Sequence, residues 1–411
     1  MRTRDANTRR TLRRLRKKSE RETIMWILIK KTGSLILLVC ILAGVLIGCG
    51  SDDKETITVS NRKVIHEEEF GGIYIDLTID EFNALGFEYG DSVSITFSNG
   101  LKLERIPYYS GFYTKAGETL LVAYPGYPYI EVAINMGEAI WDKSGLKDGD
   151  TAEIKLEKRG EFLDVQNARN IQYKDDREAY ATDEIFANFR NVEVGNIKKG
   201  ILYRSASPCD NQHNRAGYVD KLIEKAGVKT ILNLADMDET IRGYIKDCEK
   251  ETGSSDFYSP YFLTIYNSGG VIPGRIAPYY RSEDASGKIG KSIEDMVKRE
   301  PPYLVHCTEG KDRTGYMCIV LEALCGASLD ELRDDYMITY DNYYGITEKN
   351  DPDKYNILVR DLFDPLIEIM IGDESIDPKT ADLSQYAEKY LEFCGVTKDT
   401  IEKLKERLTK A

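Results

Sequence analysis

The chain has 411 residues, of which 42% are hydrophobic and 30% charged, so it is long enough for two folded domains and a tail. Its 69 acidic residues outnumber its 56 Lys and Arg residues, giving a formal net charge of −13. Residues 1–48 hold 12 of the basic residues but only three acidic ones, so the remainder has 44 basic against 66 acidic residues, a net charge of −22. Such a surface repels nucleic acid, which excludes a DNA or RNA partner.

The N-terminal segment has the pattern of an export signal. A basic region is followed by the apolar stretch 35–45, whose length is typical of a signal peptide. Small residues precede Cys49 and polar residues follow it, which resembles the lipobox of bacterial lipoproteins. The resemblance implies that residues 1–48 are removed and that a lipid on Cys49 anchors the protein to the outer face of a bacterial membrane. An uncleaved transmembrane anchor is the alternative, and Met25 is an alternative start because the basic leader is long.

Residues 49–70 are polar and are expected to form a tether, and residues 71–163 a β-rich accessory domain. Two segments of this domain, 86–97 and 145–156, form an internal repeat: both have two glycines, a Gly-Asp turn and an alternating apolar pattern after the turn. Each copy comes after a short helical stretch, the first with a Thr-x-x-Glu capping box at 78–81. Helix, tight turn and strand, made twice, predict a small β-barrel-like domain.

The stretch 106–156 resembles the C-terminal β domain of the S-adenosylmethionine hydroxide adenosyltransferases. In that family the site is shared with another domain, for which this chain has no counterpart, so the resemblance implies a fold and no activity. The aromatic residues of the segment 108–129 form either barrel core and rim or a ligand surface. The partner of this domain is not written in the sequence.

Residues 183–411 alternate between strand and helix patterns. This alternation predicts a parallel or mixed sheet with helices on both faces. The segment 336–373 is longer and more aromatic than a plain connection and is expected to form a helical lid. The other expected elements are a strand pair at 188–192 and 200–205, a helix over 219–226 that stops at Gly227, a buried strand at 230–234, a helix over 289–297, and two amphipathic helices within 386–408.

The most informative segment is 306–315, which reads His-Cys-Thr-Glu-Gly-Lys-Asp-Arg-Thr-Gly. A short apolar strand at 303–305 leads in and a helical apolar pattern follows, so the loop between them aims its amides at one point. Amides at a helix N-terminus bind anions and favour a thiolate over a thiol, which predicts that Cys307 is a nucleophile. Arg313, six positions further on, can grip two phosphoryl oxygens with its planar guanidinium.

These ten residues resemble the signature loop of the Cys-based protein tyrosine phosphatases. The Lys311-Asp312 pair resembles the bacterial tyrosine phosphatase family whose members also hydrolyse phosphoinositides. The resemblance implies hydrolysis of phosphotyrosine, or of phosphoinositides or inositol phosphates, through a phosphocysteine intermediate and without metal or cofactor. It gives His306 a structural role and assigns substrate binding to Thr308, Glu309, Gly310, Lys311 and Thr314. A non-catalytic module that captures phosphorylated ligands at the cell surface is the alternative.

The sequence departs from the family pattern at the position of the general acid. The family usually reads Asp-Leu-Arg at the end of the second strand, whereas this chain has Asn-Leu-Ala-Asp-Met-Asp at 233–238. Asp236 and Asp238 are therefore candidates, and so is Asp312, which we favour because the loop itself places it beside the phosphate. His66 and His213 have no plausible ligand partners and are interpreted as surface histidines.

Cysteine usage argues against a disulfide framework. Six of the 8 cysteines follow Cys49, and if Cys307 stays free an odd number remains. Cys318 and Cys325 lie two turns apart on one predicted helix, roughly 10 Å, which is too far to bridge.

Overall fold

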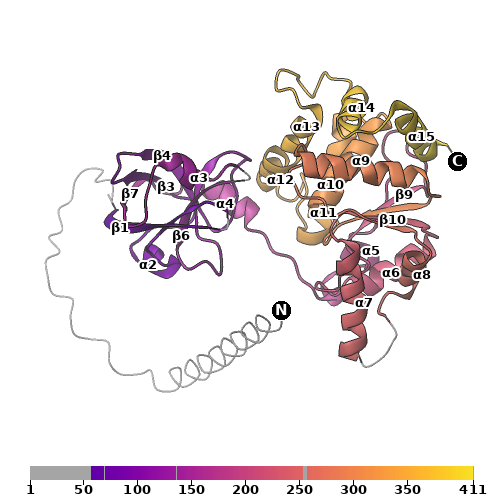
Figure 1. Cartoon of the computed structure of the whole chain (residues 1–411), viewed down its shortest axis with the longest axis horizontal. Helices are drawn as coiled ribbons and strands as arrows, with labels where there is room; N and C mark the ends of the chain where they lie inside the picture. The colour runs from indigo at the N-terminus through magenta and orange to yellow at the C-terminus, as the bar shows by residue number, and fades with distance from the viewer. Residues whose placement is uncertain (1–56, 69, 136, 253–256, 411) are drawn as a thin grey trace, which may run out of the picture. The chain divides into compact units, whose positions relative to one another are not determined.

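The computed structural model describes residues 57–410 except for residues 69, 136 and 253–256. Within them lie a closed β-barrel and an α/β domain (Figure 1). The expected signal peptide and Cys49 fall outside the described residues, so their assignment stays a prediction. None of the helices in the described part of the chain is long and apolar enough to cross a membrane.

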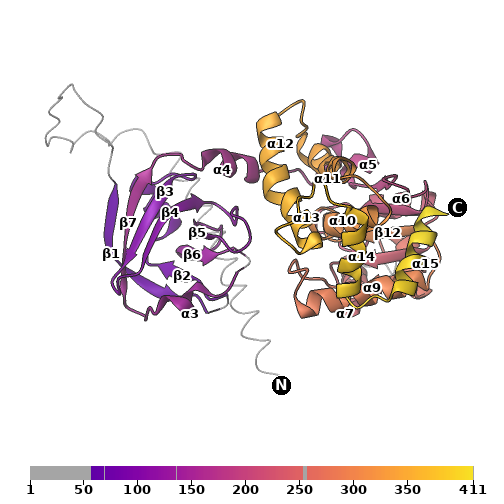
Figure 2. The same ribbon diagram turned by 90° about the horizontal axis from the view of Figure 1, so that it is seen from above.

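The barrel closes through seven strands in the order β1-β2-β6-β5-β4-β3-β7 (Figure 2). Alternate residues of these strands point inward and form one apolar cluster, in which Val93, Ile95 and Ile154 are fully buried. The predicted β-barrel-like domain is therefore confirmed. Its strands are β1 (Thr58–His66), β2 (Ile73–Ile75), β3 (Ser92–Phe97), β4 (Lys102–Tyr109), β5 (Thr119–Val122), β6 (Ile130–Ile134) and β7 (Thr151–Lys158), and its helices are α2 (Ile79–Ala84) and α3 (Ile140–Ser144), with α4 (Leu163–Arg169) following.

The internal repeat formed by 86–97 and 145–156 has a structural basis. Its two strands, β3 and β7, pair with each other antiparallel, and each follows one of the short helices α2 and α3. Both glycines of each copy have a positive φ, a conformation that favours glycine: Gly86, Gly90, Gly145 and Gly149. The capping box at Thr78 and Glu81 is also present.

The barrel begins earlier than the sequence suggests. Strand β1 lies inside the expected tether 49–70 and pairs with both β2 and β7. Its register shifts between Val59 and Arg62, and Asn61 has a φ of 57°. This irregularity interrupts the period of two between the buried Val59 and Val64, so the segment reads as polar connection rather than strand.

The α/β domain is built on a five-stranded sheet in the order β11-β10-β12-β9-β8. Four strands are parallel and β8 is antiparallel to β9, so the predicted mixed sheet and opening strand pair are confirmed. The strands are β8 (Arg190–Asn191), β9 (Leu202–Ser205), β10 (Thr230–Asn233), β11 (Val271–Pro273) and β12 (Tyr303–His306). The helices are η1 (Arg177–Ala179), α5 (Asp183–Phe186), α6 (Ala216–Lys225), α7 (Asp238–Thr252), α8 (Pro260–Asn267), α9 (Glu283–Val297), α10 (Asp312–Leu324), α11 (Leu329–Tyr344), α12 (Pro352–Leu358), η2 (Val359–Phe363), α13 (Asp364–Ile371), α14 (Leu383–Phe393) and α15 (Lys398–Thr409).

Helices cover both faces of this sheet (Figure 1). Successive strand residues point to opposite sides, so Leu232 and Val305 join the core formed with α9, α10 and α14. Ile231 and Leu304 instead join the core formed with α6, α7 and α8. Strand β12 is the central strand, and its carboxyl end is therefore enclosed by neighbours on both sides, where open α/β sheets place ligands.

Candidate active site

The loop 307–311 joins the carboxyl end of β12 to the first turn of α10. Its carbonyl groups point away from the loop centre, because each accepts a hydrogen bond from elsewhere in the domain. The backbone N–H of Leu234 donates to the His306 carbonyl, the His306 ring to Cys307 (3.1 Å), and the backbone N–H of Ser207 to Thr308 (3.0 Å). The Tyr343 hydroxyl donates to the Glu309 carbonyl (2.7 Å). The Asn188 side-chain amide and the Arg204 guanidinium both donate to the Gly310 carbonyl (3.1 Å each).

The amides of this loop are correspondingly available. Among the described residues, the N–H groups of Thr308, Glu309, Gly310 and Lys311 have no acceptor. Successive amides that converge at a helix N-terminus form an anion-binding concavity, and the partial positive charge of α10 adds to it. The geometry therefore makes a cradle for an anion of phosphate size.

Gly310 makes the tight turn of this loop possible. Its φ is +69°, and a Cβ there would stand 2.3 Å from the Ser205 carbonyl oxygen. A side chain at this position would push the loop away from β9. Gly310 thus allows the loop backbone to approach β9 closely, and its predicted part in substrate binding stays a prediction.

Cys307 lies at the floor of the cradle, only 3% exposed. The neighbouring His306 is fully buried, and burial lowers its pKa to about 4, so the ring is neutral at neutral pH. Its Nδ1 faces the Cys307 carbonyl and therefore carries the proton that it donates there. The structural role of His306 stays a prediction, which its burial and this hydrogen bond support. Thr314 is also fully buried, and its hydroxyl has no partner among the described residues.

Arg313 holds its guanidinium over the loop with two long hydrogen bonds, to the Leu234 carbonyl (3.5 Å) and to Thr308 Oγ1 (3.4 Å). Within the described residues it forms no ion pair with a carboxylate. Its planar fork keeps donors for an incoming anion, which suits two oxygens of one phosphoryl group.

The two favoured acid candidates have different surroundings. Asp236 is 6% exposed, and its carboxylate accepts hydrogen bonds from Asn233 Nδ2 (3.1 Å) and the Tyr244 hydroxyl (3.1 Å). Asp312 has 61% of its side chain exposed and lines the same pocket as Arg313. Asp238, the third candidate, accepts from the Tyr266 hydroxyl (2.6 Å) at the start of α7. Proton transfer to a substrate requires access, so this geometry favours Asp312.

Tyrosines of α11 line the pocket beside the loop. Tyr336, Tyr340 and Tyr344 share this lining with Lys311, Asp312 and Arg313. The segment 336–373 is helical, as the sequence predicts, through α11, α12, η2 and α13. Aromatic side chains of α11 therefore lie beside Lys311, Asp312 and Arg313.

A buried ion cluster supports the loop from behind. Arg204 is 1% exposed and binds both the Gly310 carbonyl and Asp335 Oδ2 (2.6 Å), while Arg190 binds the other oxygen of Asp335 (2.8 Å). Against the effect of burial, the two guanidinium groups hold the pKa of Asp335 below its usual value. Arg204 therefore has a structural role behind the loop. Asp335 was not predicted, because it lies 131 residues from Arg204.

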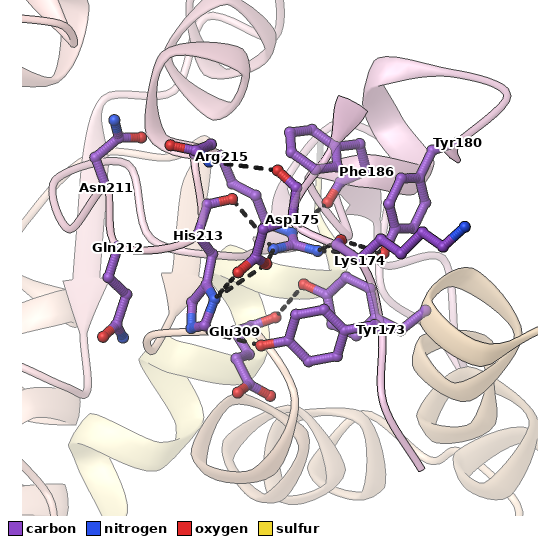
Figure 3. Close-up of polar contacts among 12 residues, drawn as sticks. Tyr173, Lys174, Asp175, Tyr180, Phe186, Asn211, Gln212, His213, Arg215 and Glu309 are labelled. Atoms are coloured by element: carbon purple, nitrogen blue, oxygen red, sulfur yellow. Dashed lines mark hydrogen bonds and ion pairs between the residues drawn. The ribbon is translucent and has the colours of Figure 1, made fainter. Parts of the chain in front are cut away.

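His213 is only partly exposed, and its ring has specific partners that the sequence does not predict. Its side chain is 24% exposed, and Nδ1 lies 3.1 Å from the carboxylate of Asp175 (Figure 3). Its other ring nitrogen faces the Tyr173 hydroxyl at 3.5 Å. Both partners lie on the chain segment just before η1, whose approach to the loop the sequence did not reveal. The other histidine, His66, stacks on Trp141 with ring centroids 4.6 Å apart.

The described cysteines fit the absence of a disulfide framework. Cys209, Cys307, Cys318, Cys325 and Cys394 are buried free thiols. Burial raises the pKa of Cys318 and of Cys325 to about 12, so neither is a competing thiolate at neutral pH.

A buried Cys beneath loop amides, followed on the next helix by an Arg that forms no ion pair with any described carboxylate, is the arrangement expected of a Cys-based phosphatase. The model of the tyrosine phosphatase family matches residues 165–410, more than half of the chain. The chain therefore belongs to the tyrosine phosphatase family, and its α/β domain is a hydrolase of that kind. The match begins within α4, so the barrel lies outside it, and the resemblance to the adenosyltransferase β domain stays a prediction.

Two solved structures are similar to parts of the chain. The core catalytic domain of the PP-IP phosphatase SIW14 from S. cerevisiae, in complex with citrate, is 20% identical over 41% of this chain and 86% of that one, with a TM-score of 0.24. An uncharacterized conserved protein from Thermotoga maritima is 22% identical over 28% of this chain, with a TM-score of 0.21. This chain spans 42% of that protein's length. No curated protein matches the chain, and the family assignment depends on the family model.

Proposed function

We propose that this protein hydrolyses phosphotyrosine, or a closely related aryl phosphomonoester, through a phosphocysteine intermediate. The observation that carries the proposal is the outward bonding of every carbonyl from His306 to Gly310, which leaves the loop amides for an anion above Cys307. The aromatic lining by Tyr336, Tyr340 and Tyr344 supports an aryl group as the remainder of the substrate.

In the first step the Cys307 thiolate attacks phosphorus in line, the S–P bond forms, and the bond from phosphorus to the leaving oxygen breaks. The transition state is loose, and negative charge is spread over three equatorial oxygens. Arg313 binds two of these oxygens and the loop amides bind the third. Charge also builds on the leaving oxygen, and Asp312 supplies the proton that it needs.

In the second step water attacks the phosphocysteine and releases inorganic phosphate. Asp312, deprotonated by the first step, now accepts a proton from that water, and Cys307 leaves as the thiolate that began the cycle. Asp236 is buried and accepts hydrogen bonds from Asn233, Tyr244 and Cys209, so in this scheme it holds the strand-end loop in place.

The test is a comparison of kcat/KM for a phosphotyrosine peptide and for p-nitrophenyl phosphate, whose leaving group needs less help, in the presence of EDTA. Wild type should turn over both substrates and prefer the phosphotyrosine peptide to its phosphoserine counterpart. Asp312→Asn should slow phosphotyrosine by about 10²-fold and p-nitrophenyl phosphate by less, since general acid catalysis contributes about that factor.

Asp236→Asn serves as the matched control and should show no such dependence on the leaving group. If Asp236→Asn carries the dependence and Asp312→Asn slows both substrates equally, the acid lies on the strand-end loop instead. Loss of wild-type activity in EDTA would overturn the metal-free mechanism.

We also propose that the enzyme is exported and anchored by a lipid on Cys49, as the small residues before Cys49 and the apolar stretch 35–45 suggest. Metabolic labelling with a fatty-acid analogue should mark the wild-type protein in the membrane fraction. Cys49→Ala should lose the label and accumulate unprocessed. A labelled Cys49→Ala protein would point to a different anchor.

A further inference from the structure

The charge of Lys311 is bound within the loop itself. Its Nζ lies 3.1 Å from Glu309 Oε2 and 3.8 Å from Asp312 Oδ2, and the side chains of Lys311 and Glu309 are only 20% and 27% exposed. Against the effect of burial, the two carboxylates raise the pKa of Lys311 well above its usual value. Burial alone would raise the pKa of Glu309, but the charge of Lys311 acts in the opposite direction and the net pKa is lowered. Both partners are therefore ionised at neutral pH.

Glu309 is also fixed from behind (Figure 3). Its carbonyl accepts a hydrogen bond from the Tyr343 hydroxyl at 2.7 Å, and the Tyr173 hydroxyl helps to lower the pKa of its carboxyl group. The Tyr173 ring stacks on Tyr343 with centroids 4.8 Å apart, and the Arg215 guanidinium lies 4.8 Å from that ring. Arg215 is in turn bonded to Asp175 at 2.8 Å. The Glu309 carboxylate is thus held in place for Lys311 before any substrate arrives.

Lys311 and Arg313 therefore differ in whether their charge is available to a substrate. Arg313 keeps its charge for the reacting phosphoryl group, whereas Lys311 is neutralised by Glu309. A second phosphate on the substrate, next to the first, would find no unpaired cation at Lys311 and would meet the Glu309 carboxylate. Like charges brought together in a partly buried site disfavour binding, and that cost falls on the polyphosphorylated ligand alone.

We infer that Glu309 is a specificity-determining residue, which withholds Lys311 from a second phosphate and so selects substrates that carry a single phosphoryl group. The inference rests on the proposed function and narrows its substrate class. It predicts that the enzyme prefers monophosphorylated aryl esters to polyphosphorylated inositols, which are the other substrates that the Lys-Asp pair of the loop suggests.

The experiment measures kcat/KM of the full chain for a phosphotyrosine peptide and for a soluble inositol bisphosphate with neighbouring phosphates. Glu309→Gln should raise the ratio of bisphosphate to phosphotyrosine activity by about tenfold, the size of one charge-assisted hydrogen bond gained by the freed Lys311. Tyr173→Phe removes only the hydroxyl on Glu309 and should shift the ratio in the same direction by less. The Tyr173→Phe variant also tests the inference if Glu309→Gln does not fold. The double variant Glu309→Gln/Lys311→Met should lose the gain.

Glu374→Gln is the matched control, since it removes one negative charge from an exposed position just after α13 and should leave the ratio unchanged. An equal rise in Glu374→Gln would assign the effect to net charge and overturn the inference. An unchanged ratio in both Glu309→Gln and Tyr173→Phe, or wild-type preference for the bisphosphate, would overturn it while leaving the phosphatase function intact. A wild type that hydrolyses neither substrate nor p-nitrophenyl phosphate would remove the proposed function and this inference together.

Discussion

Replacing Cys307 with serine is expected to lower kcat for p-nitrophenyl phosphate by at least about 10³-fold, because the step that forms the covalent intermediate loses its nucleophile. The loop amides and the α10 N-terminus stabilise an anion at this position. A serine hydroxyl is far harder to ionise in the same surroundings. The amides, Arg313 and the aromatic wall all remain, so substrate should still bind while turnover stops.

The control for this prediction is a second Cys→Ser change, at the C-terminal end of the helix that follows the loop. Cys325 caps the far end of α10, is 3% exposed and lies outside the phosphate loop, so Cys325→Ser should keep wild-type turnover. Thermal melting of both variants separates lost chemistry from lost folding. Comparable turnover in Cys307→Ser would contradict the thiolate mechanism.

The sequence predicts the phosphate loop well because the information is local. Ten consecutive residues set the strand end, the tight turn at Gly310 and the start of α10, so residue order alone fixes which groups face the anion. The strand and helix alternation of the α/β domain is predictable for a similar reason, since each strand is a short apolar run between helices of clear period. The mixed sheet follows from such patterns.

The parts that sequence did not predict depend on contacts between distant segments. Glu309 pairs with a neighbour two positions away, but what fixes it is Tyr173, which reaches the loop from the segment before η1. The general acid is difficult to assign for the same reason. From sequence alone Asp236 looks like a turn residue, whereas the structure shows that its carboxylate accepts hydrogen bonds from Asn233 and Tyr244. Strand β1 was missed because its register shift breaks the alternation by which strands are recognised.

Arg313→Lys is expected to lower kcat by about 10²- to 10³-fold although it keeps the positive charge, a loss comparable to removing one preorganised donor from a transition-state site. The guanidinium presents two parallel N–H groups to two equatorial oxygens, and these contacts strengthen as charge spreads over the oxygens. A lysine ammonium is a point charge on a flexible stem and cannot span both. Because the ground-state dianion is still attracted to a cation, KM should change less than kcat.

Arg333→Lys on α11 provides the matched control, since Arg333 pairs with Asp330 and Asp334 at the surface and its replacement should leave both kinetic constants near wild type. Steady-state kinetics with p-nitrophenyl phosphate and the phosphotyrosine peptide measure both variants. If Arg313→Lys stays within a few-fold of wild type, the guanidinium does not hold two phosphoryl oxygens, and the absence of an ion pair at Arg313 among the described residues has another cause. A fall in kcat with little change in KM is the pattern that a donor acting chiefly in the transition state produces.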